Sequence, residues 1–181
     1  MGPARFPDGL ERRAAVEVRA VAGRRLEGYA ATFNTPATIG RFVEVVQPGA
    51  FRASLTTPGR DVLALVDHDP SRLLARTSSG TLRLAEDGRG LAFALDVPDT
   101  QLGRDVLTLA ERRDLGGMSF GFRVIEETWP AADRRELRAV ELVEVSVVHA
   151  FPAYSQTTVQ ARARAPDAHA AAVRHRLLDL A

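Results

Sequence analysis

The chain has 181 residues, a length that suits one domain with its own hydrophobic core. A formal net charge of +1 gives no global field that would draw the protein to nucleic acid or to an anionic membrane. The absence of cysteine excludes disulfides, thiolate catalysis and cysteine-ligated zinc, and four histidines leave little for a metal site, so we expect no cofactor. The N-terminus lacks the apolar core of a signal peptide and no apolar run approaches the length of a membrane span, which predicts a cytosolic protein.

Strand patterns dominate the chain after its first residues. Residues 1–13 are rich in Pro, Gly and Arg and are predicted to be a flexible segment. Apolar and alternating runs then predict strands at about 16–21, 26–33, 42–46, 62–66, 73–77, 81–85, 91–95, 118–124 and 137–148, with a short helix at 50–55. We expect one domain over 14–160, followed by an Arg/Ala-rich tail over 161–181 in which residues 167–180 fit a helix.

The clearest helix signal covers residues 101–113. Leu102, Val106, Leu109 and Ala110 form one apolar stripe, and Asp99 or Thr100 can cap the first turn. Gly116 and Gly117 are expected to end it. The order of elements is mainly β with few helices (α+β), which favours an antiparallel β-barrel surrounded by a few helices over a doubly wound sheet.

The first candidate for chemistry is His68. It stands in Asp67-His68-Asp69-Pro70, directly after the apolar run 62–66, where side chains reach the surface from a rigid strand. A lone histidine is more often structural than catalytic, so this segment indicates catalysis only if suitable partner residues exist elsewhere in the chain.

The second candidate is Ser119, within Gly117-Met118-Ser119-Phe120-Gly121. Strand alternation places Ser119 and Gly121 on one face and Met118 and Phe120 on the core face. A serine flanked by glycines is open to a substrate, although a small polar residue at the start of a strand is the simpler interpretation.

The third candidate is Glu144, in the strand 141–148. Alternation groups it with Leu142 and Ser146, opposite Val143, Val145 and Val147. A carboxylate in so apolar a strand is costly to bury unpaired, so it should have a partner, either an Arg or an imidazole N–H. Together, His68, Ser119 and Glu144 would supply a base, a nucleophile and an orienting acid.

An ordered set of segments resembles the prohead maturation proteases of tailed phages, which are related in fold to the herpesvirus assemblins. The similar stretches are Glu27-Gly28-Tyr29-Ala30 with Phe33, then 47–51, Asp67-His68-Asp69, 117–122, 142–148 and Pro152-Ala153-Tyr154. The resemblance runs from about Gly28 to Val159. It implies a serine endopeptidase with a β-barrel fold, His68 as base and Ser119 as nucleophile, and Glu144 where the herpesvirus relatives have a second histidine.

The resemblance also implies partners and a place of action. Members of the family cut scaffolding protein, or a scaffolding segment of the major capsid protein, inside the immature capsid in the cytoplasm of the bacterial host. They often cut themselves, which makes the tail after Val159 a candidate for self-cleavage. Related proteases often dimerise, so a homodimer is one expected assembly. Neither nucleic acid nor membrane is an expected partner.

Four alternatives compete with this interpretation. The sequence 117–121 fits the G-x-S-x-G elbow of esterases, which requires a strand before the serine and a helix after it. Asp67-His68-Asp69 could belong to a hard-metal site, although neighbouring strand residues point to opposite faces. Ser146 is the fallback nucleophile. The non-enzymatic alternative is a β-barrel that serves as a capsid accessory or interaction module.

Overall fold

The structure is a computed structural model that describes residues 10–15, 17–21 and 24–149. The elements along the chain are β1 (Glu11–Ala15), β2 (Glu17–Val21), β3 (Arg25–Thr32), β4 (Ala37–Ile39), β5 (Phe42–Val46), α1 (Arg52–Thr56), β6 (Leu63–Val66), β7 (Asp69–Arg76), β8 (Leu82–Glu86), β9 (Gly90–Asp96), α2 (Gln101–Arg112), β10 (Gly117–Ala131) and β11 (Arg134–Val148). No helix in the described ranges has the length and apolar character needed to cross a membrane.

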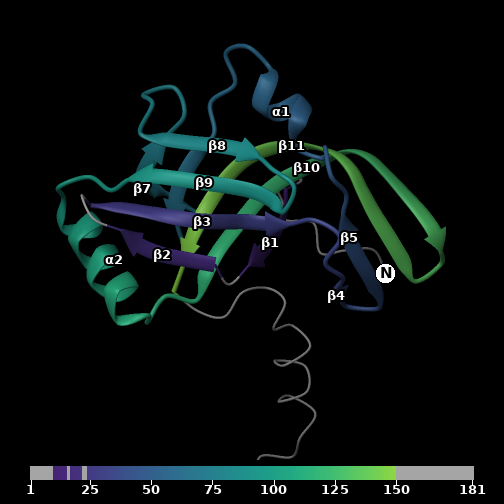
Figure 1. Ribbon diagram of the computed structural model, residues 1–181, viewed down its shortest axis with the longest axis horizontal. Coiled ribbons are helices and arrows are strands. Elements are labelled where there is room, and N and C mark those ends of the chain that lie inside the picture. Colours follow the sequence, from purple (N-terminus) through teal and green to yellow (C-terminus); the bar gives the residue numbers. More distant parts are fainter. Residues whose placement is uncertain (1–9, 16, 22–23, 150–181) are drawn as a thin grey trace, which may run out of the picture.

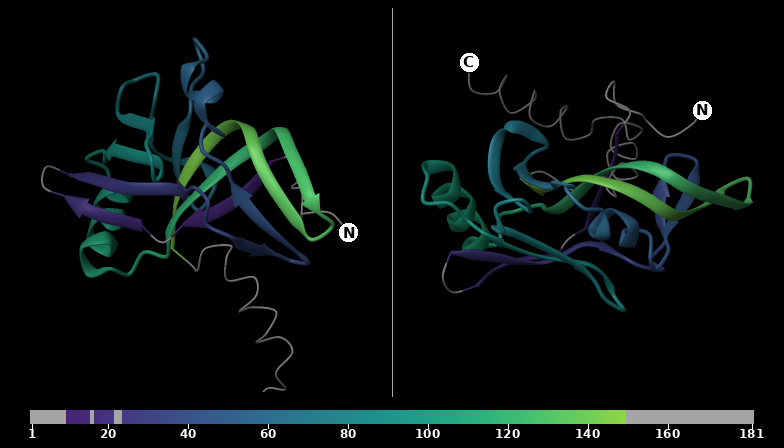
Figure 2. Two further views of the ribbon diagram at one scale, coloured as in Figure 1. Left: turned by 45° about the vertical axis from the view of Figure 1, so that its right-hand side comes forward. Right: turned by 90° about the horizontal axis from the view of Figure 1, so that it is seen from above.

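The strands form two sheets that lie in separate layers (Figures 1 and 2). The first has the order β1-β10-β11-β5-β4, with β6 and β7 added beside β11, and the second has the order β2-β3-β9-β8. β11 is the central strand of the first sheet. It pairs with β10 in antiparallel fashion, and with β5 and β6 in parallel along its first and last residues.

The mainly β architecture with few helices is confirmed, whereas a closed barrel is not. Among the described residues no ladder joins the two sheets, and the pairings of β11 with β5 and β6 are parallel rather than antiparallel. The first two strands of the chain already belong to different sheets: β1 ends at Ala15 in the first sheet and β2 begins at Glu17 in the second. Alternating patterns predict strands, but they carry no information about which sheet each strand joins.

The core lies between the two layers and follows the alternation of the strands. Leu26, Leu95 and Leu82 stand side by side across β3, β9 and β8 and are almost completely buried. The same core cluster contains an aromatic group, in which the Phe120 ring lies 5.4 Å from Phe51 and 5.1 Å from Phe122. Because successive residues of a strand point to opposite faces, the burial of Phe120 and Phe122 in the core places Ser119 on the outer face of β10.

Helix α2 covers one end of the two layers (Figure 1). Its predicted cap is confirmed, because the Thr100 hydroxyl accepts a hydrogen bond of 3.2 Å from the Gly103 N–H. The helix ends at Arg112 because Arg113 adopts a left-handed backbone with φ 63°, so the end comes before the predicted glycine pair.

Some strands differ from the predicted ones. β1 and β4 were not predicted, and residues 11–13 of the predicted flexible segment belong to β1. β10 and β11 are each 15 residues long and form a hairpin that extends beyond the core (Figure 1). The predicted tail and its helix lie outside the described residues.

A buried group of charges explains why β1 is a strand of the first sheet. Glu11, Arg13, Glu44 and Arg135 are each 5% exposed or less. Arg135 donates to Glu11 at 2.7 Å and to Glu44 at 2.9 Å, and Arg13 donates to Glu44 at 2.6 Å and to Glu11 at 2.8 Å. Burial would raise the pKa of Glu11, but the hydrogen bonds and charges of Arg135 and Arg13 lower it below its ordinary value of 4.5.

We predict that Arg135→Met lowers the free energy of unfolding by about 3–5 kcal/mol at pH 7, because it leaves two buried carboxylates with one cation. Glu11 has a lowered pKa in the folded protein, so its contribution is present above pH 4.5 and is lost as the pH falls through the folded value. The difference in the free energy of unfolding between wild type and variant should therefore become smaller at acidic pH. Urea unfolding measures both effects, with the half-exposed Arg138→Met as control. A loss of under 1 kcal/mol would contradict this role.

Candidate functional site

The three predicted segments come together at one edge of the first sheet. β6 and β11 run parallel, with Val66 beside Val147, so both strands end at this edge. β10 runs the other way and begins there, with Gly117 opposite Val148. The sheet topology thus brings the residues after β6, the first residues of β10 and the last residues of β11 into one region.

Ser119 is the third residue of β10, which begins at this edge with Gly117. Its neighbours across the strands are Ser146 on β11 and Ala14 on β1. The residue is 2% exposed, and its hydroxyl donates a hydrogen bond of 2.8 Å to the main-chain carbonyl of Arg13. The structure therefore holds the Ser119 oxygen against the backbone of β1, so the open position predicted from the flanking glycines is wrong for this arrangement.

His68 occupies the turn between β6 and β7. Asp67 and His68 form a two-residue hairpin loop in which both residues have positive φ, 52° and 62°. Positive φ at both loop residues is the geometry of a type I′ turn, which matches the twist of the strands but usually contains Asn and Gly. The imidazole Nδ1 lies 2.6 Å from Oε1 of Glu144, and the side chain is 21% exposed.

Glu144 is a buried carboxylate with two hydrogen-bond partners, His68 and Ser146. Oε1 accepts the Nδ1 hydrogen bond of His68, and Oε2 accepts a short hydrogen bond from the Ser146 hydroxyl. The guanidinium of Arg12 stands further off, with Nε 3.8 Å from Oε1. The carboxylate is thus paired in the way its burial requires.

Opposite Glu144, β10 carries Gly121, and the absence of a side chain there makes room for the carboxylate. A Cβ atom at this position would lie 2.3 Å from Oε1 of Glu144. Ser119 and Gly121 therefore share a face of β10 with Ser146 and Glu144 of β11, because residues directly opposite in a ladder point to the same side.

A β-bulge corrects the predicted faces of β11. Gly121 is opposite Glu144, but Phe122 is opposite Leu142, so Val143 is an extra residue in the ladder. Leu142 consequently lies in the core, not beside Glu144 as predicted. The bulge leaves Glu144 and Ser146 on the outer face together.

The structure joins two of the three predicted residues directly. His68 and Glu144 are hydrogen-bonded to each other. Ser119 lies on the face of the β10–β11 pair that also carries Glu144. The Ser119 hydroxyl is bonded to Arg13 rather than to His68. Within the described part of the chain, Nε2 of His68 has no hydrogen-bond partner.

The alternative interpretations do not fit this geometry. Ser119 is in a strand that follows a helix, which is the reverse of the esterase elbow. Asp67, His68 and Asp69 bond to different partners, namely His149, Glu144 and Ser71. Across the described ranges there is no group of three or more His, Asp or Glu side chains arranged to hold a metal ion. Ser146, the fallback nucleophile, is fully buried and donates to Glu144.

Sequence reasoning missed the support that Asp67 and His149 give to the site. Asp67 Oδ2 lies 2.6 Å from His149 Nδ1, and Oδ1 accepts the His149 backbone N–H at 2.9 Å. Burial would raise the pKa of Asp67, but the His149 and Arg72 hydrogen bonds lower it below its ordinary value of 3.8. The parallel pairing of β6 with β11, which brings 67 and 149 together, could not be derived from either segment alone.

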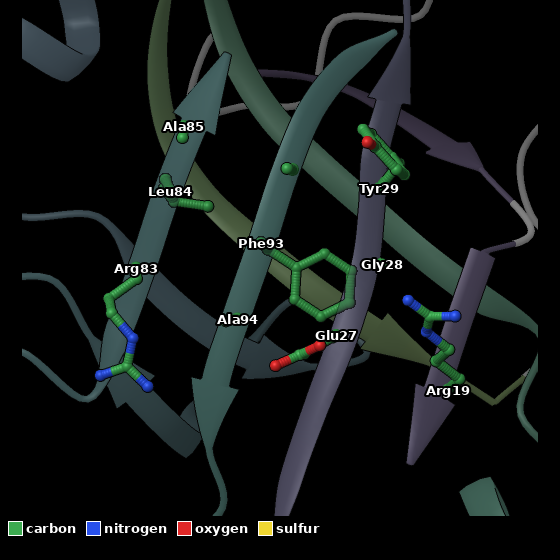
Figure 3. A pocket seen from close by; sticks show the side chains of 10 residues that line it. Arg19, Glu27, Gly28, Tyr29, Arg83, Leu84, Ala85, Phe93 and Ala94 are labelled. Atoms are coloured by element: carbon green, nitrogen blue, oxygen red, sulfur yellow. The ribbon is translucent and has the colours of Figure 1, made fainter. Parts of the chain in front are cut away.

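A hollow of about 370 Å³ lies elsewhere, along β2, β3, β9 and β8 (Figure 3). Arg19, Glu27 and Arg83 stand in one row across these strands, with the small Ala94 between Glu27 and Arg83. None of its lining residues is His68, Ser119 or Glu144, so this hollow is separate from the candidate site.

Comparison with solved structures identifies the class of fold. The bacteriophage T4 capsid assembly protease, gp21, superimposes with a TM-score of 0.53 at 10% sequence identity, over 78% of this chain and 97% of the T4 chain. At so low an identity the likeness establishes the fold alone.

Comparison with protein families identifies the protein more closely. The model of the caudovirus prohead serine protease family matches residues 13–171. The chain therefore belongs to this family of phage capsid-maturation enzymes and is a serine protease. No curated protein matches the chain.

We predict that Gly121→Ala breaks the hydrogen bond between His68 and Glu144, because the new Cβ would lie only 2.3 Å from Oε1 and would displace the carboxylate. NMR of the Nδ1 proton of His68 should show its low-field signal in the wild type and not in the variant. Gly88→Ala is the control, since a Cβ at that glycine has no atom within 4 Å. An unchanged signal in Gly121→Ala would show that the carboxylate does not need this space.

Proposed function

We propose that Ser119 is the nucleophile of this protease, His68 its general base and Glu144 the acid that orients His68. The observation that carries the proposal is the 2.6 Å contact of Nδ1 with Glu144, on a strand pair that also carries Ser119. A carboxylate bonded to Nδ1 keeps the proton on that nitrogen, which leaves the Nε2 lone pair to act as the base.

The proposed reaction begins with a rotation of the Ser119 side chain. The hydroxyl leaves the Arg13 carbonyl by turning about Cα–Cβ, a change between staggered rotamers, and then approaches Nε2. Catalytic hydrogen bonds are often absent before substrate binds, so the resting contact with Arg13 is compatible with the role.

The chemistry then follows the scheme of serine proteases. Nε2 removes the hydroxyl proton as Oγ attacks the peptide carbonyl carbon, and the imidazolium is stabilised by Glu144. Collapse of the tetrahedral intermediate breaks the C–N bond, and Nε2–H protonates the leaving amine. Water, deprotonated by the same nitrogen, hydrolyses the acyl-enzyme and restores Ser119.

Ser146 takes a supporting part in this proposal. Its hydroxyl donates to the second oxygen of Glu144, so it holds the carboxylate in the orientation that meets His68. The Ser146 proton is already given to a carboxylate, whereas the Ser119 hydroxyl is bonded to a neutral main-chain carbonyl. This favours Ser119 over Ser146 as the nucleophile.

We infer that the substrates are scaffolding protein, or a scaffolding segment of the major capsid protein, and that cleavage occurs inside the immature capsid in the host cytoplasm. Membership of the prohead protease family supports this inference. In the proposed organisation the protease domain spans 14–160, and residues 161–181 form a tail. The homodimer and the likeness to herpesvirus proteases stay predictions.

Coexpression with the cognate capsid and scaffolding proteins tests the nucleophile. We expect mass spectrometry to find cleaved capsid or scaffolding protein with the wild type and only intact proteins with Ser119→Ala, because the substitution removes the proposed nucleophile and leaves the hydrogen bond between His68 and Glu144 in place. Ser146→Ala, the matched control, should retain cleavage at a reduced rate. Processing by Ser119→Ala, together with its loss in Ser146→Ala, would assign the nucleophile to Ser146.

The tail offers a separate test. We predict that the wild-type chain loses residues within 161–181 during capsid maturation, and that Ser119→Ala keeps them. Intact-mass measurement of the protease from mature particles and from Ser119→Ala proheads distinguishes the two. A wild-type chain with its tail intact after maturation would contradict self-cleavage there.

A further inference from the structure

The position of His68 depends on the backbone conformation of the turn that carries it. Asp67 and His68 both have positive φ, a region that residues with a side chain seldom occupy and that Asn, Asp and Gly tolerate best. His68 is therefore in an uncommon conformation that contacts with the surrounding structure help to maintain. If the turn relaxed, the imidazole would move away from Glu144.

The carboxylate of Asp67 supplies much of this restraint. Oδ1 accepts the backbone N–H of His149, and Oδ2 accepts from the His149 ring at 2.6 Å and from Arg72 at 2.8 Å. The Asp67 backbone N–H donates to the Val147 carbonyl at 2.9 Å. Three of these four bonds tie the turn to the end of β11.

The same strand, β11, carries Glu144. The base and the acid are thus held to one element, His68 through its neighbour in the turn and Glu144 through the strand itself. Asp69, on the other side of His68, makes no comparable bond: among the described residues its carboxylate accepts only from Ser71, two positions along its own strand.

We propose that Asp67 is a positioning residue, which together with His149 clamps the turn to β11 and so keeps the His68 imidazole on Glu144. This inference rests on the proposed function for its effect on the reaction. Asp67 touches neither Glu144 nor Ser119 through any hydrogen bond of the described residues, so it acts only through His68.

The exposure of the clamp separates this role from a role in folding. The side chains of Asp67, His149 and Arg72 are 37%, 33% and 36% exposed. Interactions between charged groups at such exposure contribute little to the free energy of unfolding. Their loss should therefore change the position of His68 without unfolding the domain.

Asp67→Asn is the decisive variant, because Asn adopts positive φ as readily as Asp but has only one acceptor oxygen. It cannot accept the hydrogen bonds that Oδ1 and Oδ2 of Asp67 together receive from His149 and Arg72. We expect kcat on a scaffold-derived peptide to fall by about tenfold or more with KM unchanged, because a misplaced base affects the transition state more than substrate binding. Asp69→Asn, the matched control, should stay within twofold of the wild type. The midpoint of urea unfolding should be the same in all three proteins.

His149→Ala provides a second variant, in which the turn sequence is unaltered. It should lower kcat in the same way, and the double variant with Asp67→Asn should lose little more, because both substitutions remove one clamp. Equal losses in Asp67→Asn and Asp69→Asn, or a kcat of Asp67→Asn within twofold of the wild type, would overturn the proposal.

Failure of the proposed function is recognised separately. If Ser119→Ala retains activity, the assignment of the nucleophile fails, and the clamp is then judged by the low-field Nδ1 proton signal of His68. Loss of that signal in Asp67→Asn but not in Asp69→Asn supports the clamp whatever the nucleophile, and an unchanged signal in Asp67→Asn overturns it.

Discussion

The carboxylate of Glu144 lies where water hardly reaches it, and it is the hydrogen bonds from His68 and Ser146 that make this burial tolerable. An unpaired carboxylate there would be costly, so the need for partners constrains two strands and one turn at once. β11 must present Glu144 and Ser146 on one face, β10 must leave space at Gly121, and the turn after β6 must bring His68 within reach. The geometry of the site follows from satisfying this one group.

β11 provides the framework in which these conditions are met. It pairs with β10 along its whole length and with β6 at its end, so the elements that carry Ser119 and His68 meet on it. The bulge at Val143 reverses the alternation at one point, which keeps Leu142 in the core while Glu144 faces outward. A shift of one residue elsewhere in the ladder would bury Ser119 in the aromatic core and expose Phe120.

The grouping of Ser119, His68 and Glu144 could be predicted because each residue had a local signal, and their catalytic roles stay a prediction. Ser119 stood between glycines, His68 followed an apolar strand, and Glu144 interrupted a run of valines. The helix 101–112 and most strands followed from periodicity in the same way. The buried charges show the limit of that reasoning: Glu11 and Arg13 in an Arg-rich N-terminal segment are typical of a solvated chain, yet they lie in the core against Glu44 and Arg135, which are distant in the sequence. The Val143 bulge and the Asp67–His149 contact are likewise products of pairing between strands, for which one sequence carries no direct signal.

A crystal structure of the protein inactivated by a peptidyl phosphonate would test whether Ser119 and His68 act together on a peptide carbonyl. We expect phosphorus bonded to the Ser119 oxygen, that oxygen released from the Arg13 carbonyl, and Nε2 of His68 within about 3 Å of it, with Nδ1 still on Glu144. Phosphorus on any other residue, or on Ser119 with the imidazole turned away from it, would show that the two residues do not act together.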